Sequence, residues 1–187
     1  GTVWADVDLD TDLDLFFANG AIPVRDLVGD REPAVLLENP TGDGRNGEFS
    51  DASSTVGLDA SGPLLARGAA AADYDNDGDI DLALGTIGGD LVLLRNTGAG
   101  GNWLLVSPSP PSPGTRVTVT LDDGTDMIRE IQAGSSYLSS EDPRAHFGLG
   151  STDRVASVVV DWPDGSSSRY DDVAADQILQ VEPSAGG

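Results

Sequence analysis

Two short segments of the sequence carry aspartate at every second position. Loop 1 spans residues 6–14 and loop 2 spans residues 73–81; their aspartates are Asp6, Asp8, Asp10, Asp12 and Asp14 in loop 1, and Asp73, Asp75, Asp77, Asp79 and Asp81 in loop 2. Alternate carboxylates on a tight loop can converge on Ca²⁺, which takes roughly six to eight oxygen ligands at about 2.3–2.6 Å. The pattern therefore predicts one Ca²⁺ site in each loop, with a solvated acidic turn as the alternative.

The loops differ from an EF-hand at their C-terminal ends. An EF-hand loop has a bidentate Glu at position 12 and continues into a helix. Position 12 is Phe17 for loop 1 and Leu84 for loop 2, and both belong to short apolar runs that are typical of strands. We therefore expect strand–loop–strand sites whose side-chain ligands end at position 9, with the backbone carbonyl of position 7 as a further ligand.

Position 6 distinguishes the two loops. Gly78 occupies it in loop 2, and glycine allows the positive φ that folds the chain back around an ion. Thr11 occupies it in loop 1, and a β-branched residue resists positive φ. The site in loop 2 is therefore predicted with more certainty than the site in loop 1. Five neighbouring carboxylates should also repel one another and raise some of their pKa values.

The two loops belong to an internal repeat. All five aspartates coincide at an offset of 67 residues, and each loop is followed by an apolar run, Leu15–Ala18 or Leu82–Leu84. A recurring unit of this kind predicts stacked β-units such as propeller blades. The period exceeds the usual blade length of about 40–50 residues. The stretch Asn39–Pro63, rich in Gly, Asn, Asp and Pro, is expected to hold the excess as loop.

The rest of the chain also has a β pattern, and no apolar run predicts a helix. Residues 96–114 are rich in Gly and Pro and are expected to join two modules, with a strand at Trp103–Ser107. Further strands are predicted at Ala34–Leu37, Gly68–Ala72, Leu91–Leu94, Arg116–Leu121, Met127–Ile131, Val155–Val160 and Gln177–Val181, with turns at Asp122–Gly124 and Pro163–Gly165. The sequence predicts an all-β chain with blade-like units at residues 1–100 and a small β-sandwich-like domain at residues 101–187.

The charge of the chain favours cations as partners. It has 32 acidic residues against 10 basic ones, all of them Arg, and its net charge is −22. Such a charge repels nucleic acids and anionic lipid surfaces, so we expect neither as a partner. The acidic residues are 26 Asp and 6 Glu, a bias that suits oxygen-ligand cages, although a source with biased composition is an alternative. The sequence contains no run of about 18 apolar residues, so we expect no membrane insertion.

Few residues offer covalent or acid–base chemistry. The chain has no Cys and no Lys, and its single histidine, His146, lies between Ala145 and Phe147 in a setting typical of a structural residue. Trp103 and Trp162 stand near predicted strand ends and are interpreted as packing residues. We predict no catalytic residues and a non-enzymatic function. Because Asp is so abundant, an Asp-dependent hydrolase stays open as a less favoured alternative.

Longer motifs carry a family resemblance. Residues 67–82, followed by Leu94-Arg95-Asn96-Thr97-Gly98, resemble an FG-GAP/VCBS repeat, the blade unit of integrin-type β-propellers. The second part resembles the ASPIC/UnbV domain of cartilage-acidic-protein-like proteins, through the segments Asn102-Trp103-Leu104, Gly114-Thr115-Arg116-Val117, Gly134-Ser135-Ser136-Tyr137-Leu138-Ser139, His146-Phe147-Gly148-Leu149-Gly150 and Val160-Asp161-Trp162-Pro163-Asp164-Gly165.

The resemblance implies Ca²⁺ in both loops, secretion or display on the cell surface, and a binding or adhesion function with a protein or glycan partner. An accessory role in secondary-metabolite biosynthesis of the enediyne type is the alternative, because ASPIC/UnbV-type proteins also occur there. Two blades cannot close a propeller, so we expect a truncated first repeat and further blades in a longer protein.

Overall fold

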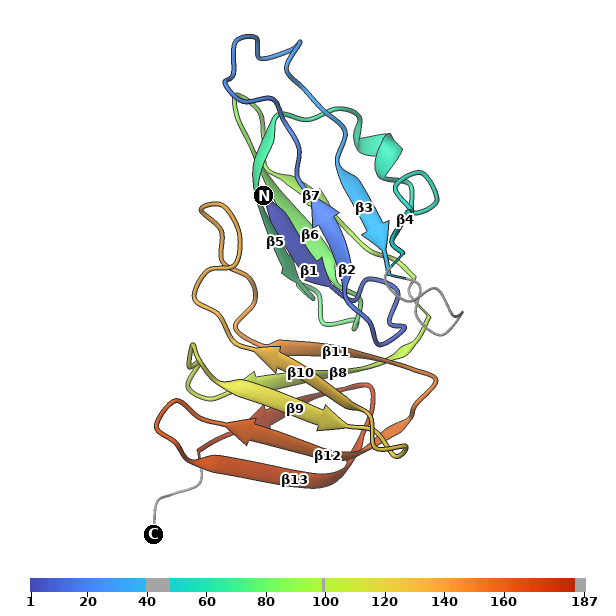
Figure 1. The fold of residues 1–187 in the computed structure, drawn as a ribbon, viewed down its shortest axis with the longest axis vertical. Coiled ribbons are helices and arrows are strands. Elements are labelled where there is room, and N and C mark those ends of the chain that lie inside the picture. The colour runs from blue at the N-terminus through green and yellow to red at the C-terminus, as the bar shows by residue number, and fades with distance from the viewer. Residues whose placement is uncertain (40–47, 99, 184–187) are drawn as a thin grey trace.

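The computed structural model describes residues 1–39, 48–98 and 100–183, which form two β modules stacked along the long axis (Figure 1). The first module contains two antiparallel sheets. One has the strand order β1 (Thr2–Ala5), β2 (Asp14–Phe17), β3 (Val35–Glu38), β4 (Ser50–Asp51), and the other the order β5 (Ala66–Ala72), β6 (Asp81–Thr86), β7 (Val92–Leu94). Both sheets are up-and-down meanders, one with four strands and the other with three. A 3₁₀ turn, η1 (Leu58–Ser61), precedes β5.

The first module is held together by a core between its two sheets. Along β1 and β2 buried residues alternate with more exposed ones, so Val3 and Phe16 point inward. Across from them β5 contributes alanines, including the fully buried Ala69, and β6 contributes Leu84. Small side chains on β5 let the two sheets approach closely, while Phe16 fills the space between them.

The second module is a two-layer sandwich. One sheet has the order β10 (Asp126–Glu130), β9 (Arg116–Thr120), β12 (Arg154–Asp161), β13 (Ser167–Ala174), and the other the order β11 (Ala145–Gly150), β8 (Asn102–Pro108), β14 (Gln177–Val181). All neighbouring strands are antiparallel except β14 and β8, which are parallel. Val117, Val119, Phe147 and Val158 are fully buried between the layers, and Trp162 is 5% exposed.

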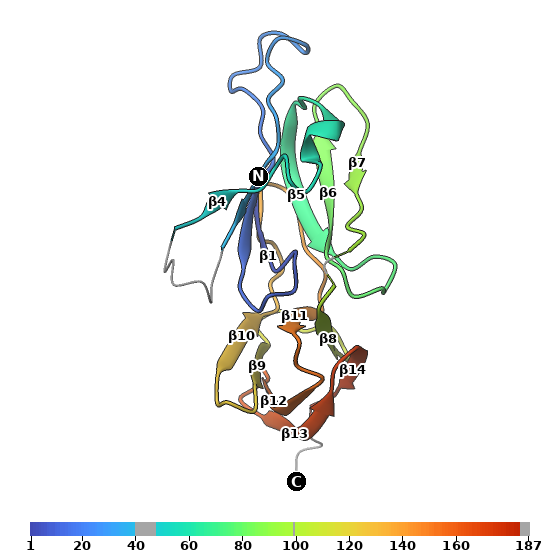
Figure 2. The ribbon, with the colours of Figure 1, turned by 90° about the vertical axis from the view of Figure 1, so that its right-hand side faces the viewer.

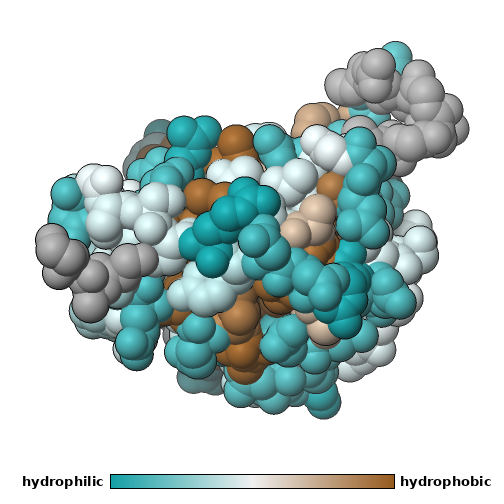
Figure 3. All heavy atoms as spheres, turned by 90° about the horizontal axis from the view of Figure 1, so that it is seen from below, coloured by the Kyte–Doolittle hydropathy of each residue, from teal (hydrophilic) through white to brown (hydrophobic). Residues whose placement is uncertain are grey.

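The smaller sheet of the second module faces the first module, with β8 and β11 at the junction (Figure 2). The segment between β10 and β11 also extends along the first module: the Thr2 N–H donates to Ser136 Oγ (3.1 Å), and the Asp142 N–H donates to the Ala71 carbonyl (3.3 Å). Seen from below, the molecule is mostly hydrophilic, with hydrophobic residues exposed in several small patches (Figure 3).

The all-β fold is confirmed, and the elements agree closely with the sequence pattern. Strand Gln177–Val181 has the expected bounds, and Gly124 and Gly165 have positive φ at the two expected turns. Strands β11 and β13 were not predicted. The expected loop Asn39–Pro63 contains β4 and η1, and its residues 40–47 lie outside the described part of the chain. Among the described residues no helix is long and apolar enough to cross a membrane.

Candidate metal centres

Each Asp-rich loop connects two antiparallel strands of the first module. Loop 1 joins β1 to β2, whose register pairs Ala5 with Asp14, and loop 2 joins β5 to β6, whose register pairs Ala72 with Asp81. The strands on either side agree with the expected strand–loop–strand form. Because the two strand pairs bring the ends of each loop together, the aspartates at positions 1 and 9 lie side by side at the base of the loop.

The aspartates at position 1 are buried and hold the loop backbone. Asp6 accepts the Asp10 N–H at Oδ1 and the Thr11 N–H at Oδ2, both at 3.1 Å. Asp73 accepts the equivalent bonds from Asp77 and Gly78, also at 3.1 Å. Asp6 is 1% exposed and Asp73 is fully buried. The same two hydrogen bonds in both repeats show that the loops share one conformation.

The backbone torsions agree with this equivalence. Leu9 and Asn76 at position 4 have φ of 62° and 60°, and Thr11 and Gly78 at position 6 have φ of 91° and 98°. Thr11 therefore adopts the positive φ that a β-branched residue disfavours, and loop 1 keeps the conformation of loop 2. The buried Asp6 carboxylate provides the physical reason, because its bond from the Thr11 N–H holds the chain in this conformation.

Three of the five aspartates in each loop converge. Carboxylate oxygens of Asp6, Asp8 and Asp14 lie within 4.8 Å of one another, and so do those of Asp73, Asp75 and Asp81. Two ligands on opposite sides of a Ca²⁺ ion are separated by about 4.6–5.2 Å, so both groups fit this ion. The donors are all carboxylate oxygens from positions 1, 3 and 9, a hard set that suits a hard cation.

The aspartates at positions 5 and 7 have other contacts. Asp10 Oδ1 accepts the Asp12 N–H (3.0 Å), and Asp77 Oδ1 accepts the Asp79 N–H (3.1 Å). Asp77 also forms an ion pair with Arg95 through its other oxygen. These aspartates were predicted as ligands from their spacing, and the structure places them outside the convergent groups. The carboxylates of position 5, Asp10 and Asp77, stabilise the turn through these bonds from the N–H groups of position 7.

Burial makes the negative charge of the loops costly. It is the main cause that raises the pKa of Asp6 to about 7, with the charges of Asp10, Asp8 and Asp14 adding to it. Burial also raises the pKa of Asp14 to about 6 and, in loop 2, raises the pKa values of Asp73 and Asp81. The pKa of Asp77 is lowered, first by the Asp79 N–H. A bound cation would offset the cost of ionising the buried carboxylates.

Two asparagines complete the loops and were missed as site residues. The Asn39 N–H donates to Asp14 Oδ1 (2.9 Å), and the Asn96 N–H donates to Asp81 Oδ1 (2.8 Å). The side chain of Asn96 also donates to the Val7 carbonyl of loop 1 (2.7 Å), so it connects the two loops. A signal was present, because Leu-Glu-Asn at 37–39 matches Leu-Arg-Asn at 94–96.

Loop 1 packs against strand β11 of the second module. The Gly150 N–H donates to the Leu9 carbonyl (2.8 Å), and Leu9 is 2% exposed. A Cβ on Gly148 would lie 2.2 Å from Asp6 Oδ2, so only glycine permits this approach. Arg129, whose guanidinium lies 5.2 Å from the centre of the Phe147 ring, is the basic group near Asp6 and Asp12.

Loop 2 packs against β8 and β11. The Trp103 indole covers Gly78, where a Cβ would meet Trp103 Nε1 at 2.1 Å. His146 Nε2 lies 2.8 Å from the Gly78 carbonyl, so this nitrogen carries the proton and donates it. Arg144 donates to the Asp73 carbonyl (2.8 Å) and to Asn76 Oδ1 (2.7 Å). His146 and Trp103 thus have structural contacts at the junction.

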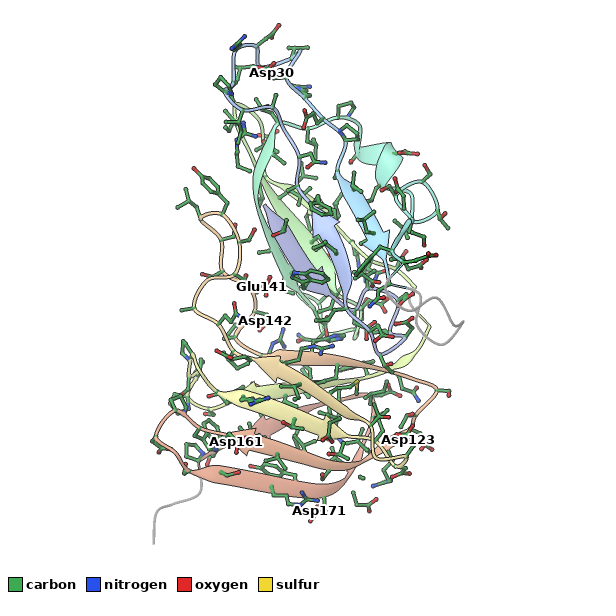
Figure 4. The ribbon with its side chains drawn as sticks, viewed as in Figure 1. Asp30, Asp123, Glu141, Asp142, Asp161 and Asp171 are labelled. Atoms are coloured by element: carbon green, nitrogen blue, oxygen red, sulfur yellow. The ribbon has the colours of Figure 1, made fainter. Side chains whose placement is uncertain are left out.

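The acidic residues labelled in Figure 4 are dispersed. Glu141 and Asp142 lie near the junction, Asp30 lies at the far end of the first module, and Asp123, Asp161 and Asp171 are spread over the second module (Figure 4). Asp142 is paired with Arg144. Among the described residues, the groups of carboxylates suited to a metal are those of loops 1 and 2.

Comparison with known proteins finds a family match in the second module. Residues 107–187 match the family described as ASPIC and UnbV. Cartilage acidic protein 1 from Homo sapiens is 34% identical to the chain over 173 residues, which cover 87% of this chain and 24% of that protein. The protein of the same name from Xenopus tropicalis is 33% identical over 174 residues, with 86% and 25% covered. The chain spans about a quarter of the length of these relatives.

These comparisons support the part of the resemblance that concerns the ASPIC/UnbV domain and cartilage acidic proteins. The matched region contains most of the motifs that suggested the domain, including Gly114–Val117, His146–Gly150 and Val160–Gly165. The interpretation of residues 1–100 as FG-GAP/VCBS repeats stays a prediction.

Proposed function

We propose that this chain is a non-catalytic, calcium-binding module of an extracellular binding or adhesion protein, with one Ca²⁺ in each Asp-rich loop. The observation that carries the proposal is the equivalence of the loops. Both bury the aspartate of position 1, form the same backbone hydrogen bonds and bring the oxygens of positions 1, 3 and 9 within 4.8 Å. A merely solvated turn has no need to bury its carboxylates.

The ligand set favours Ca²⁺ over other common cations. Zn²⁺ prefers nitrogen and sulfur ligands, and no His or Cys belongs to either group. Mg²⁺ requires a near-ideal octahedron at about 2.0–2.1 Å and keeps several waters, whereas a many-ligand loop suits the larger ion. Asp6, Asp8 and Asp14 would hold the ion in loop 1, and Asp73, Asp75 and Asp81 in loop 2.

The proposed location rests on the relatives and on the affinity range of such sites. Similarity to proteins named cartilage acidic protein supports secretion or display on the cell surface. Calcium sites of extracellular modules bind with Kd values of about 10⁻⁴–10⁻³ M. A protein or glycan remains the proposed partner class, and the proposed domain division lies between residues 100 and 101.

Calorimetric titration of the chelator-treated chain tests the proposal. We expect Ca²⁺ to bind at two sites, and the double variant Asp6→Asn with Asp73→Asn to lose both, because each change removes a charge at the buried base of a loop. Asp30→Asn is the matched control, since Asp30 lies at the opposite end of the first module. Tighter binding of Zn²⁺ than of Ca²⁺, or no Ca²⁺ binding, would overturn the assignment.

A further inference from the structure

Glu38 and Arg95 occupy equivalent positions in the two repeats but carry opposite charges. Each follows a leucine of the third strand that pairs with the second strand, Leu37 with Leu15 in one sheet and Leu94 with Leu82 in the other. Each precedes the asparagine whose N–H donates to the aspartate at position 9 of its loop. The backbone therefore presents both side chains to the same part of their respective loops.

Both side chains meet the aspartate at position 3. Arg95 Nη2 lies 2.6 Å from Asp75 Oδ2 and 3.1 Å from Asp77 Oδ2. Glu38 is a charged neighbour of Asp8, and both residues border the same hollow. Asp8 and Asp75 belong to the convergent groups of their loops, so the two side chains act on a proposed Ca²⁺ ligand in each case.

The space around these side chains allows a ligand to approach. A hollow of about 240 Å³ between the two sheets of the first module is bordered by Asp8, Glu38, Arg95 and Asn96. The Arg95 side chain is 51% exposed. It can therefore be replaced or displaced without opening the core.

The other basic groups near the loops do not cancel this difference. Arg129 is the basic neighbour of Asp6 and Asp12 in loop 1. Arg144 contacts the Asp73 carbonyl in loop 2 and is paired with Asp142. The second module thus adds +1 at loop 1 through Arg129 and no net charge at loop 2, where Asp142 balances Arg144. With −1 at Glu38 and +1 at Arg95, the surroundings of loop 1 are still one charge more negative than those of loop 2.

We propose that the residue at the C-terminal end of the third strand sets the Ca²⁺ affinity of each site: Glu38, the last residue of β3, strengthens the site in loop 1, and Arg95, directly after β7, weakens the site in loop 2. The inference rests on the proposed function, because it concerns affinity at the same two sites. An arginine on Asp75 competes with the cation for a ligand, whereas a glutamate beside Asp8 adds negative charge and oxygen atoms. Loop 1 is then the tighter site, despite Thr11.

The test measures one site at a time in the whole chain. Asp8→Asn removes a ligand from loop 1 and leaves loop 2 to be titrated with Ca²⁺; Asp75→Asn removes a ligand from loop 2 and leaves loop 1 to be titrated. In the Asp8→Asn background, Arg95→Glu should tighten Ca²⁺ binding at least about tenfold. The affinity of Arg95→Gln should lie between those of Arg95→Glu and the unchanged Arg95. In the second background, Glu38→Arg should weaken binding by at least a similar factor, with Glu38→Gln again between.

Two charge-matched controls lie in the second module. Arg154→Glu reverses a charge in β12, where Arg154 is 47% exposed and paired with Asp172, and Glu182→Arg does so at an exposed position after β14. Both should change Ca²⁺ affinity less than about twofold, since exposed charges beyond the Debye length of about 10 Å are screened. If Arg95→Glu and Glu38→Arg change Ca²⁺ affinity no more than these controls do, the inference is overturned, while the proposed function still stands. No Ca²⁺ binding in either background would overturn the proposed function as well.

Discussion

Thr11 and Gly78 have nearly the same backbone conformation, with φ of 91° and 98°, although only one of them is glycine. Both N–H groups donate at 3.1 Å to the buried aspartate that begins their loop. The hydrogen bond and the burial of that aspartate fix the turn in both repeats. In loop 1 the turn is therefore kept at the cost of backbone strain.

Replacing Thr11 by Gly should relieve this strain. A residue with a Cβ in the left-handed region costs about 1–2 kcal/mol, and part of the gain is offset by the larger unfolded-state entropy of glycine, about 0.5–1 kcal/mol. We expect the free energy of unfolding, measured with urea at saturating Ca²⁺, to rise by about 0.5–1 kcal/mol. The same change at Thr118, an extended residue of β9, should lower it. A loss of stability in Thr11→Gly would contradict the assignment of strain.

Replacing Gly78 by Ala should have the opposite effect. The new Cβ would lie 2.1 Å from Trp103 Nε1, and φ is also positive at this position. The chain can respond only by moving Trp103 away from loop 2, so we expect a loss of about 2–4 kcal/mol in the free energy of unfolding. Gly98→Ala is the control, because its Cβ would meet no atom within 4 Å. Equal stability of the two variants would show that Trp103 does not hold loop 2 in solution.

Much of this site could be predicted from sequence, because its chemistry is local. Alternating aspartates, the glycine at position 6 and the apolar runs on either side all act within a few residues, and the structure keeps them in one turn. The spacing did not show which carboxylates converge. Asp10 and Asp77 have the same alternation as Asp8 and Asp75, but their carboxylates lie outside the convergent groups.

Contacts between segments that are distant in the sequence could not be predicted from local sequence patterns. Asn96 bonds to Val7, 89 residues away, and His146 bonds to Gly78, 68 residues away. Strand β11 was missed because Gly148 and Gly150 weaken its apolar pattern. The structure gives the reason for the first of them, since the Asp6 carboxylate lies where its side chain would be. Those glycines therefore serve the junction between the modules.

Binding of Ca²⁺ to loop 1 should release protons below about pH 7. Without the ion, Asp6 in the folded chain has a pKa raised from 3.8 to about 7, so between these values the folded chain holds a proton that the unfolded chain releases. That contribution to stability is present at low pH and is lost as the pH rises to about 7. Ca²⁺ must displace the same proton, so its apparent affinity should increase over this range.

Calorimetry of the Asp75→Asn variant in buffers of different ionisation enthalpy measures this release. We expect about one to two protons per Ca²⁺ near pH 5–6, because Asp14 also has a raised pKa of about 6, and almost none above about pH 8. Loop 1 is used because His146, whose pKa is lowered to about 4 mainly by burial, contacts loop 2. Ca²⁺ affinity that is constant from pH 5 to 8 would contradict the burial of Asp6.

Removal of Ca²⁺ should loosen the second module as well as the first. A ligand at about a hundred times its Kd stabilises the state that binds it by about 2.7 kcal/mol per site. Both loops contact the second module, through the Gly150–Leu9 bond and through the packing of Trp103 on Gly78. We therefore expect chelation to lower the melting temperature of the whole chain and to increase hydrogen exchange in β8 and β11.

Hydrogen exchange followed by mass spectrometry separates this coupling from stabilisation of the loops alone. The amide of Gly150 reports the junction directly, because it donates to Leu9 of loop 1, whereas Val158 and Val160 of β12 lie in the sheet farther from the loops. Chelation should accelerate exchange at Gly150 more than in β12, and the double variant Asp6→Asn with Asp73→Asn should give the fast rate with or without Ca²⁺. If the exchange rates in β8 and β11 do not change with Ca²⁺ while those in β2 and β6 do, the ions stabilise the first module without holding the second module against it.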